Sequence, residues 1–275
     1  MSKITIKQVQ SWKSKKNFSA ITAYDFTSAK IINQTNIPIV LVGDSASMIS
    51  YGYDSTVPVS MDEILLITRA VSRGINSSLV VGDMPFGSYQ HSVSVAIKNA
   101  ARFLKEGRVS AVKLEGGVLV RKHISKIVDF GIPVMGHVGL TPQSVNQLSG
   151  YSVQGKSIAS AQKILDDARA VENSGAFAVV LECVPAELAK KITSTLSIPT
   201  IGIGSGKHCD GQIQVFNDIL GLDDDFSPRH TKKYLNLQKS IVSALKKYNN
   251  EVASSKFPQK KHSTSYKTNI VDKLQ

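Results

Sequence analysis

Seven short runs of mostly apolar residues recur along the 275-residue chain. They are rich in Val, Ile and Leu, and most lack the apolar and polar alternation of a strand with one exposed face. Consecutive apolar residues indicate strands buried on both faces, as in a parallel sheet covered by helices. The runs are residues 18–23, 39–43, 79–82, 111–114, 132–135, 178–181 and 198–203.

Segments with helical signals separate these runs. Ser60 and Glu63 have the spacing of a capping box before ILLITRAV, and Gly107 and Gly175 follow periodic segments as C-terminal caps do. Strand and helix therefore alternate, which allows either a closed (β/α)8 barrel or an open doubly wound sheet.

The turn after the first run separates these two folds. An open dinucleotide-binding sheet carries G-x-G-x-x-G there, whereas this chain reads TAYDFTSAK. We therefore predict a single-domain α/β protein with a (β/α)8 TIM barrel of the phosphoenolpyruvate/pyruvate type. The eighth strand is expected at 210–216 and a terminal helix at 231–248. The barrel with its N-terminal segment and terminal helix is predicted to span 1–249, and 250–275 to form a polar, basic tail.

The cysteine content and the short apolar runs indicate a protein of a reducing compartment with no membrane span. No apolar run approaches the roughly 20 residues of a membrane span, and the polar start lacks the apolar segment of a signal peptide. Cys183 and Cys209 are too few for a disulfide framework. We expect a cytoplasmic protein with no membrane partner.

The formal net charge of +12 raises a second class of function, nucleic-acid binding. The excess is concentrated at the end of the chain, because residues 229–275 hold eleven Lys/Arg and two Asp/Glu. The rest has a basic surplus of only three. No aromatic residues interleave with the lysines in a recognition pattern, so a solvated tail is favoured and no nucleic-acid partner is expected.

Four of the apolar runs finish in an acid, and this repetition predicts a site. In a barrel the carboxyl ends of the strands build the active site, so Asp44, Asp83, Glu115 and Glu182 converge there. Lys113 shares a strand face with Glu115. Singly, an Asp after a strand is often a helix N-cap, and Lys113 with Glu115 could be a structural ion pair. Jointly, clustered carboxylates resist burial unless a cation offsets them, and oxygen ligands favour Mg²⁺ or Mn²⁺ over Zn²⁺.

Two further motifs follow later strands. His137, in IPVMGHVGLTPQS, is expected just past the fifth strand, where a structural and a functional role are about equally supported. IGIGSG, at 201–206, has the composition of a phosphate-binding turn, although glycines also serve tight turns.

Several long stretches closely resemble the ketopantoate hydroxymethyltransferase family. They extend over most of residues 3–262 and include LVGDSASM, GDMPFGSY, VKLEGG, PVMGHVGLTPQSVNQLSGYSVQGK, LECVPAELAKKIT and IPTIGIGSG followed by CDGQIQV. The resemblance implies a barrel assembled as a homodecamer. It also implies transfer of a hydroxymethyl group from 5,10-methylenetetrahydrofolate to 3-methyl-2-oxobutanoate, the first committed step of pantothenate synthesis.

The resemblance also assigns roles to individual residues. Asp44, Asp83 and Glu115 match the family's Mg²⁺ site, and Asp44 and Asp83 match substrate contacts as well. Ser45, Lys113 and His137 match positions that contact the substrate. Glu182 matches the proton acceptor.

Another enzyme class of the same fold remains as the alternative. Mg²⁺-dependent lyases and mutases of the phosphoenolpyruvate/pyruvate type also chelate an α-keto acid through acids at strand ends. That group generally carries a catalytic loop with a cysteine, and no comparable Cys-Gly-His segment occurs in this chain.

Overall fold

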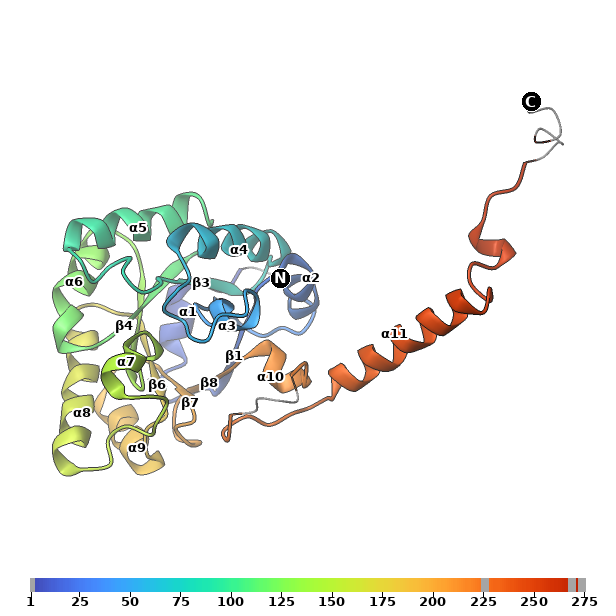
Figure 1. Cartoon of the computed structure of the whole chain (residues 1–275). Helices are drawn as coiled ribbons and strands as arrows, with labels where there is room; N and C mark the ends of the chain where they lie inside the picture. Colours follow the sequence, from blue (N-terminus) through green and yellow to red (C-terminus); the bar gives the residue numbers. More distant parts are fainter. Residues whose placement is uncertain (1–2, 224–227, 267–270, 272–275) are drawn as a thin grey trace. The chain divides into compact units, whose positions relative to one another are not determined.

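The computed structural model describes residues 3–223, 228–266 and 271. In it, eight parallel strands, β1 to β8, close into a barrel in the order of the chain (Figure 1). This arrangement confirms the predicted (β/α)8 fold. The strands are β1 (Phe18–Thr22), β2 (Ile39–Val42), β3 (Leu79–Asp83), β4 (Ala111–Glu115), β5 (Val134–Gly139), β6 (Ala178–Glu182), β7 (Thr200–Ile203) and β8 (Gly211–Gln214).

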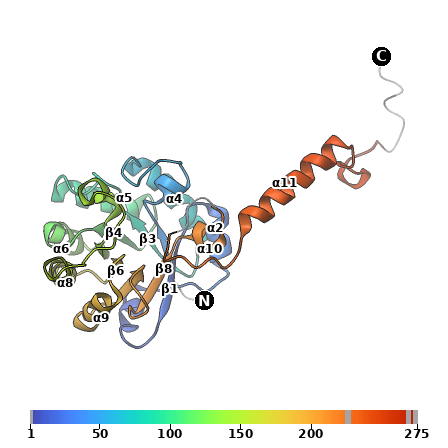
Figure 2. The same cartoon turned by 60° about the horizontal axis from the view of Figure 1, so that its bottom comes forward.

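Helices follow most strands, and α4, α5, α6, α8 and α9 lie around the barrel (Figure 2). The helices of the described residues are α1 (Ile6–Ser11), α2 (Phe26–Ile32), α3 (Ala46–Ile49), α4 (Met61–Gly74), α5 (Val93–Lys105), α6 (Arg121–Asp129), α7 (Val145–Leu148), α8 (Ile158–Asn173), α9 (Ala186–Thr195), α10 (Phe216–Leu220) and α11 (Leu237–Ala253). The described part of the chain also contains the short 3-10 helices η1 (Val118–Val120), η2 (Pro142–Ser144) and η3 (Lys260–His262). No described helix is long and apolar enough to cross a membrane.

Local sequence signals explain where these elements begin. The predicted capping box of α4 is present, because the Ser60 hydroxyl accepts from Glu63 N and the Glu63 carboxylate accepts from Ser60 N. Gly175 follows α8 with φ +89°, a value that glycine adopts without strain. Pro142 is the first residue of η2, where a missing N–H costs nothing.

The barrel interior is apolar near the amino ends of the strands and polar at their carboxyl ends. Inward side chains such as Ile39, Leu79 and Met135 form one buried cluster that includes Val9 of α1, and Trp12, the C-cap of α1, packs against it. Strand register then places Asp83 beside Lys113, and Glu115 beside His137. The acids predicted at the strand ends therefore lie at the polar end of the barrel interior, next to the buried apolar cluster.

Some boundaries differ from the predictions. The fifth strand covers Val134–Gly139 rather than 132–135, and the eighth covers only Gly211–Gln214 of the expected 210–216. The terminal helix begins at Leu237, because the Asn236 side chain accepts from Lys239 N, and it ends at Ala253.

The chain divides into two compact units, residues 1–216 with 228–231, and residues 217–227 with 232–275. The predicted division at residue 249 falls inside α11. The proposed extents of the barrel domain and the tail stay predictions.

Candidate active site

Asp83 and Lys113 form a buried ion pair at the carboxyl ends of β3 and β4. The strand register sets the two residues side by side, and Lys113 Nζ donates to both carboxylate oxygens of Asp83 at 2.8 Å. Their side chains are 1% and 4% exposed. The predicted convergence of these residues is present.

Asp44 follows β2 and joins this pair through its backbone. Its N–H donates to Asp83 Oδ2 at 3.2 Å, and its own Oδ2 accepts from Gln143 Nε2 at 2.9 Å. Asp44 is buried, so its carboxylate lies inside the site and does not serve as a solvated helix cap.

Glu115, the last residue of β4, carries a buried oxygen without a hydrogen bond. Its Oε2 accepts from Gln143 N at 3.0 Å, while Oε1 has no hydrogen-bond partner in the described part of the chain. The nearest nitrogen atoms are Lys113 Nζ, at 3.8 Å from Oε1, and His137 Nδ1, at 3.5 Å. A buried, unsatisfied carboxylate oxygen is costly without a cationic or donor partner.

His137 lies between two glutamates. Its Nε2 is 3.4 Å from Glu182 Oε2, at the end of β6, and its Nδ1 faces Glu115. Neither contact has hydrogen-bond geometry. Burial, with a contribution from Lys113, lowers the pKa of His137, so the neutral ring is favoured. His137 was expected past the strand but lies within β5.

Ser45 is set apart from this group. Its hydroxyl forms a 2.8 Å hydrogen bond with the Tyr24 hydroxyl, and it is only partly buried. No hydrogen bond or ion pair among the described residues joins its side chain to the other predicted site residues. Ser45 therefore lies beside the site in a partly buried position, with its hydroxyl bonded to Tyr24.

The electrostatic balance of the site favours an added cation. Asp44, Asp83 and Glu115 share one ammonium group, that of Lys113. Burial is the largest effect on both shifted acids: it raises the pKa of Asp83 to about 7, against the attraction of Lys113, and raises the pKa of Glu115 well above its usual value. Nearby Asp44 adds to both shifts. Protons or a metal ion would both relieve this repulsion.

The donor set suits a hard cation, but not a complete protein cage. Carboxylate oxygens are the ligands that Mg²⁺ prefers, and Glu115 Oε1 is free to serve as one. No three His, Cys, Asp or Glu side chains in the described residues form a group ready to hold an ion. Mg²⁺ is commonly bound by one or two carboxylates, with water and substrate oxygens completing its shell.

Two residues of this site were missed by the sequence analysis. Gln143 contacts both Asp44 and Glu115, and Tyr89 exchanges hydrogen bonds with Gln143 and with the backbone of Glu115. A polar residue directly after Pro142, in a loop following a strand, was the available signal for Gln143. Nothing local in the sequence marks Tyr89.

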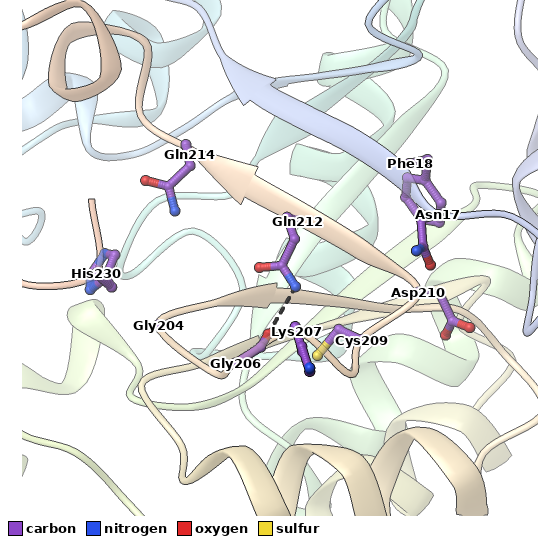
Figure 3. Close-up of a pocket in the computed structure, with 10 residues that line it drawn as sticks. All are labelled: Asn17, Phe18, Gly204, Gly206, Lys207, Cys209, Asp210, Gln212, Gln214 and His230. Atoms are coloured by element: carbon purple, nitrogen blue, oxygen red, sulfur yellow. Dashed lines mark hydrogen bonds between the residues drawn. The ribbon is translucent and has the colours of Figure 1, made fainter. Parts of the chain in front are cut away.

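A separate pocket lies along β7 and β8 (Figure 3). Its volume is about 530 Å³ and it contains none of the predicted site residues. Gly204 and Gly206 of the IGIGSG run line it, and the Gly206 carbonyl accepts from Gln212 Nε2 at 2.9 Å. Both glycines have positive φ, which the turn requires. A phosphate-binding role for this run stays a prediction.

Comparison with known sequences identifies close relatives over the full length. The sequence model of the ketopantoate hydroxymethyltransferase family matches residues 3–260. A 3-methyl-2-oxobutanoate hydroxymethyltransferase of Dehalococcoides mccartyi is 52% identical over 271 residues, covering 98% of this chain and 96% of that protein. That of Carboxydothermus hydrogenoformans is 50% identical over 275 residues, with both chains fully covered.

Solved structures share the fold at low identity. A crystal structure of phosphonopyruvate hydrolase matches with a TM-score of 0.61 and 12% identity, covering 98% of this chain and 94% of that chain. A 2,3-dimethylmalate lyase, a member of the PEP mutase/isocitrate lyase superfamily, matches with a TM-score of 0.58 and 13% identity, covering 95% and 92%. These likenesses concern the fold alone.

A closed parallel barrel with a buried, charge-rich group at the carboxyl ends of its strands is the architecture of a (β/α)8 barrel enzyme. The full-length matches specify which one. The chain belongs to the ketopantoate hydroxymethyltransferase family and is an enzyme of hydroxymethyl transfer.

Proposed function

We propose that this enzyme transfers a hydroxymethyl group from 5,10-methylenetetrahydrofolate to 3-methyl-2-oxobutanoate and so forms 2-dehydropantoate, with one Mg²⁺ per subunit. The observation that carries the proposal is the meeting of Asp83, Lys113, Glu115, His137 and Glu182 through contacts of 2.8–3.8 Å, in a chain about half identical to named relatives. A water molecule must supply the hydroxyl oxygen, because the donor provides only a methylene carbon.

The proposed metal ligands are Asp44, Asp83 and Glu115. When bound, Mg²⁺ would polarise the keto group of the substrate and stabilise negative charge on its oxygen, an effect worth several kcal/mol. The unsatisfied Glu115 Oε1 supports this assignment, as does the excess of acids over ammonium groups in the site. A crystal structure of phosphonopyruvate hydrolase with oxalate and Mg²⁺ has the same fold at 14% identity, which is compatible with such a site.

Substrate binding is assigned to the residues around these acids. The Lys113 ammonium offsets the carboxylate of the substrate, and the partly exposed Ser45 hydroxyl donates to it. Asp44 and Asp83 contact the substrate from the same end of the barrel. Tyr24, bonded to Ser45 Oγ at 2.8 Å, limits the rotation of that hydroxyl.

Glu182 is the proposed base for carbon 3. Its side chain is 17% exposed, more than Glu115 at 3%, and it extends from β6 rather than from the strands of the metal acids. The carboxylate takes the proton from carbon 3, and that carbon forms a bond to the methylene carbon of the donor. Both carbon–nitrogen bonds of that methylene group break, the two nitrogens take up the carbon 3 proton and one proton of the water, and the remaining hydroxyl of the water stays on the transferred carbon. Neutral His137, 3.4 Å from Glu182 Oε2, orients the carboxylate beside the reacting end of the substrate.

Proton exchange tests the substrate, the metal and the base together. With Mg²⁺ and 3-methyl-2-oxobutanoate in D₂O, the enzyme should exchange the proton at carbon 3 without folate. Glu182→Gln should slow exchange by roughly 10²–10⁴-fold and still bind Mg²⁺. The matched control Glu187→Gln, at an exposed position of α9, should behave as the parent. No exchange by the parent, with or without folate, contradicts the proposal.

Assembly and location complete the proposal: a homodecamer in the cytoplasm, with no nucleic-acid or membrane partner. Exposed Ile241, Val242, Leu245 and Tyr248 along α11 support self-association, because exposed apolar residues grouped on one helix favour contact with protein. Light scattering of the full chain measures the assembly, and a monomer at micromolar concentration would contradict it. Binding of duplex DNA at physiological salt would contradict the absence of a nucleic-acid partner.

A further inference from the structure

Gln143 uses both ends of its side chain inside the site. Its Nε2 donates to Asp44 Oδ2 and to the Met84 carbonyl, each at 2.9 Å. Its Oε1 accepts from the Tyr89 hydroxyl at 2.8 Å and from Gln90 Nε2 at 3.1 Å. Gln143 is 4% exposed, so water does not replace these partners readily.

The neighbours of this amide determine which way it faces. The Met84 carbonyl can only accept, so the nitrogen end must point to it and to Asp44. The Tyr89 hydroxyl has one proton and two acceptors within reach, Gln143 Oε1 at 2.8 Å and the Glu115 carbonyl at 3.1 Å, and the shorter contact is the one to Gln143. The orientation of the Gln143 amide therefore follows from its surroundings.

Gln143 also holds a second carboxylate through its backbone. Gln143 N donates to Glu115 Oε2 at 3.0 Å. A single residue thus binds one oxygen of Asp44 and one oxygen of Glu115. The other oxygen of Glu115, Oε1, accepts no hydrogen bond from any residue that the structure describes.

The neutrality of the amide matters as much as its position. A lysine or arginine in this place would also hold the carboxylates, but its charge would oppose a cation. Gln143 orders the two acids and leaves their negative charge in place. Hydrogen-bonded partners of this kind orient metal ligands, and removing them typically weakens metal affinity by about 10–100-fold.

We propose that Gln143 is a positioning residue for the metal site: it holds one oxygen of Asp44 and one of Glu115 and thereby turns the other oxygen of each toward a shared divalent cation. Tyr89 supports this arrangement, because its hydroxyl donates to the oxygen of the Gln143 amide and holds the amide in place. The inference rests on the Mg²⁺ site of the proposed function and adds a residue to it.

Direct metal binding by the full chain, without substrate, tests the inference. Gln143→Met keeps the side-chain volume and removes all four hydrogen bonds of the side-chain amide, while the backbone N–H to Glu115 remains. Titration with Mn²⁺, followed by electron paramagnetic resonance, should show about 10–100-fold weaker binding at an unchanged number of sites, with an altered spectrum for the bound ion. Gln162→Met makes the same chemical change at an exposed position of α8 and should leave affinity and spectrum unchanged.

A milder variant protects the test against misfolding. Tyr89→Phe retains the buried ring and removes the hydrogen bond to Gln143 Oε1. It should weaken Mn²⁺ binding in the same direction and to a smaller extent than Gln143→Met. If Gln143→Met does not fold, parental affinity and spectrum in Tyr89→Phe overturn the inference.

Asp44→Asn separates this inference from the proposed function. Weak binding by Asp44→Asn together with parental binding by folded Gln143→Met overturns the role of Gln143 alone. Absence of Mn²⁺ binding by the parent overturns the role of Gln143 and the proposed metal site together. Weakened binding by Gln143→Met, Tyr89→Phe and Asp44→Asn, with Gln162→Met unchanged, supports the inference.

Discussion

Lys113 donates to both carboxylate oxygens of Asp83 at 2.8 Å, on neighbouring strands and almost entirely shielded from water. Removing one member of a buried pair leaves an uncompensated group, which costs more than removing both. The ammonium is also the nearest cation to Glu115 Oε1. One lysine thus offsets the charge of more than one acid.

Replacing Lys113 by Met should destabilise the metal-free protein by about 3–5 kcal/mol. Adding Asp83→Asn to this variant should restore part of the loss, because the buried charge is then removed. Urea unfolding near neutral pH of the parent, both single variants and the double variant measures the coupling. Simple addition of the two single losses would contradict the coupling of these side chains.

The raised pKa of Asp83 predicts a pH-dependent effect of Mg²⁺ on stability. Asp83 binds its proton up to about pH 7 when folded, against about 3.9 in an unfolded chain. The folded state therefore holds more protons between these values, and its contribution to the free energy of unfolding falls as pH rises through this window. Mg²⁺ replaces the proton, so its stabilising effect should grow with pH.

Thermal melts with and without saturating Mg²⁺ check this at about pH 5.5 and about pH 7.5. The Mg²⁺-induced rise in Tm should be larger at the higher pH. Asp83→Asn should lose most of the difference, whereas exposed Glu187→Gln should keep it. An equal rise in Tm at both pH values would argue against proton displacement from the site.

Gly117 holds the loop after Glu115 close to α8. A Cβ at Gly117 would overlap the side chain of Asp167, whose Oδ1 accepts from Val118 N at 2.9 Å. Gly117→Ala should therefore cost about 1–3 kcal/mol in the free energy of unfolding and shift the strand end that carries Glu115. Urea unfolding and Mn²⁺ affinity measure the two effects.

Gly87→Ala provides a comparison for that variant. It places the methyl group in open space, at a φ of +80° that any non-glycine residue finds strained. Gly87→Ala should lower the free energy of unfolding by about 1 kcal/mol without weakening Mn²⁺ binding. If Gly117→Ala and Gly87→Ala weaken Mn²⁺ binding equally, Gly117 has no specific effect on the position of Glu115.

Features that depend on neighbouring residues in the sequence could be predicted well. The apolar runs located the strands, and the capping box at Ser60 was correct because both of its hydrogen bonds join residues three positions apart. Strand-end acids converged as expected, since parallel strands bring their carboxyl ends together. The C-terminal helix was placed six residues too early, because residues 231–236 carry no strong signal against a helix.

The polar contacts among distant residues could not be predicted in the same way. Gln143 and Tyr89 are 54 positions apart and meet only when β3, β4 and β5 are aligned. The sequence shows which side chains can donate, but not which acid each will reach. The contacts of Gln143 with the acids could be recognised only in the structure of the closed barrel.

The last prediction concerns Asp210, which joins the N-terminal segment to the start of β8. It accepts from Lys13 Nζ at 2.9 Å, Ser14 N at 2.8 Å and Thr200 N at 2.9 Å. Burial opposes its ionisation, but the hydrogen bonds from Thr200, Ser14 and Lys13 prevail and lower its pKa. Its stabilising contribution is therefore present above about pH 3.9 and is lost as pH falls through the lower, folded pKa.

Asp210→Asn should cost about 1–3 kcal/mol near neutral pH, because it removes the charged acceptor of several buried hydrogen bonds. The difference from the parent should shrink as the pH falls below the folded pKa, where the parental carboxyl is also neutral. Urea unfolding across the acid range measures it. Asp129→Asn, which breaks an exposed pair with Lys126, is the control and should cost less than about 1 kcal/mol. A constant deficit of Asp210→Asn at every pH would show that the shape of the side chain, not its charge, holds this end of the barrel together.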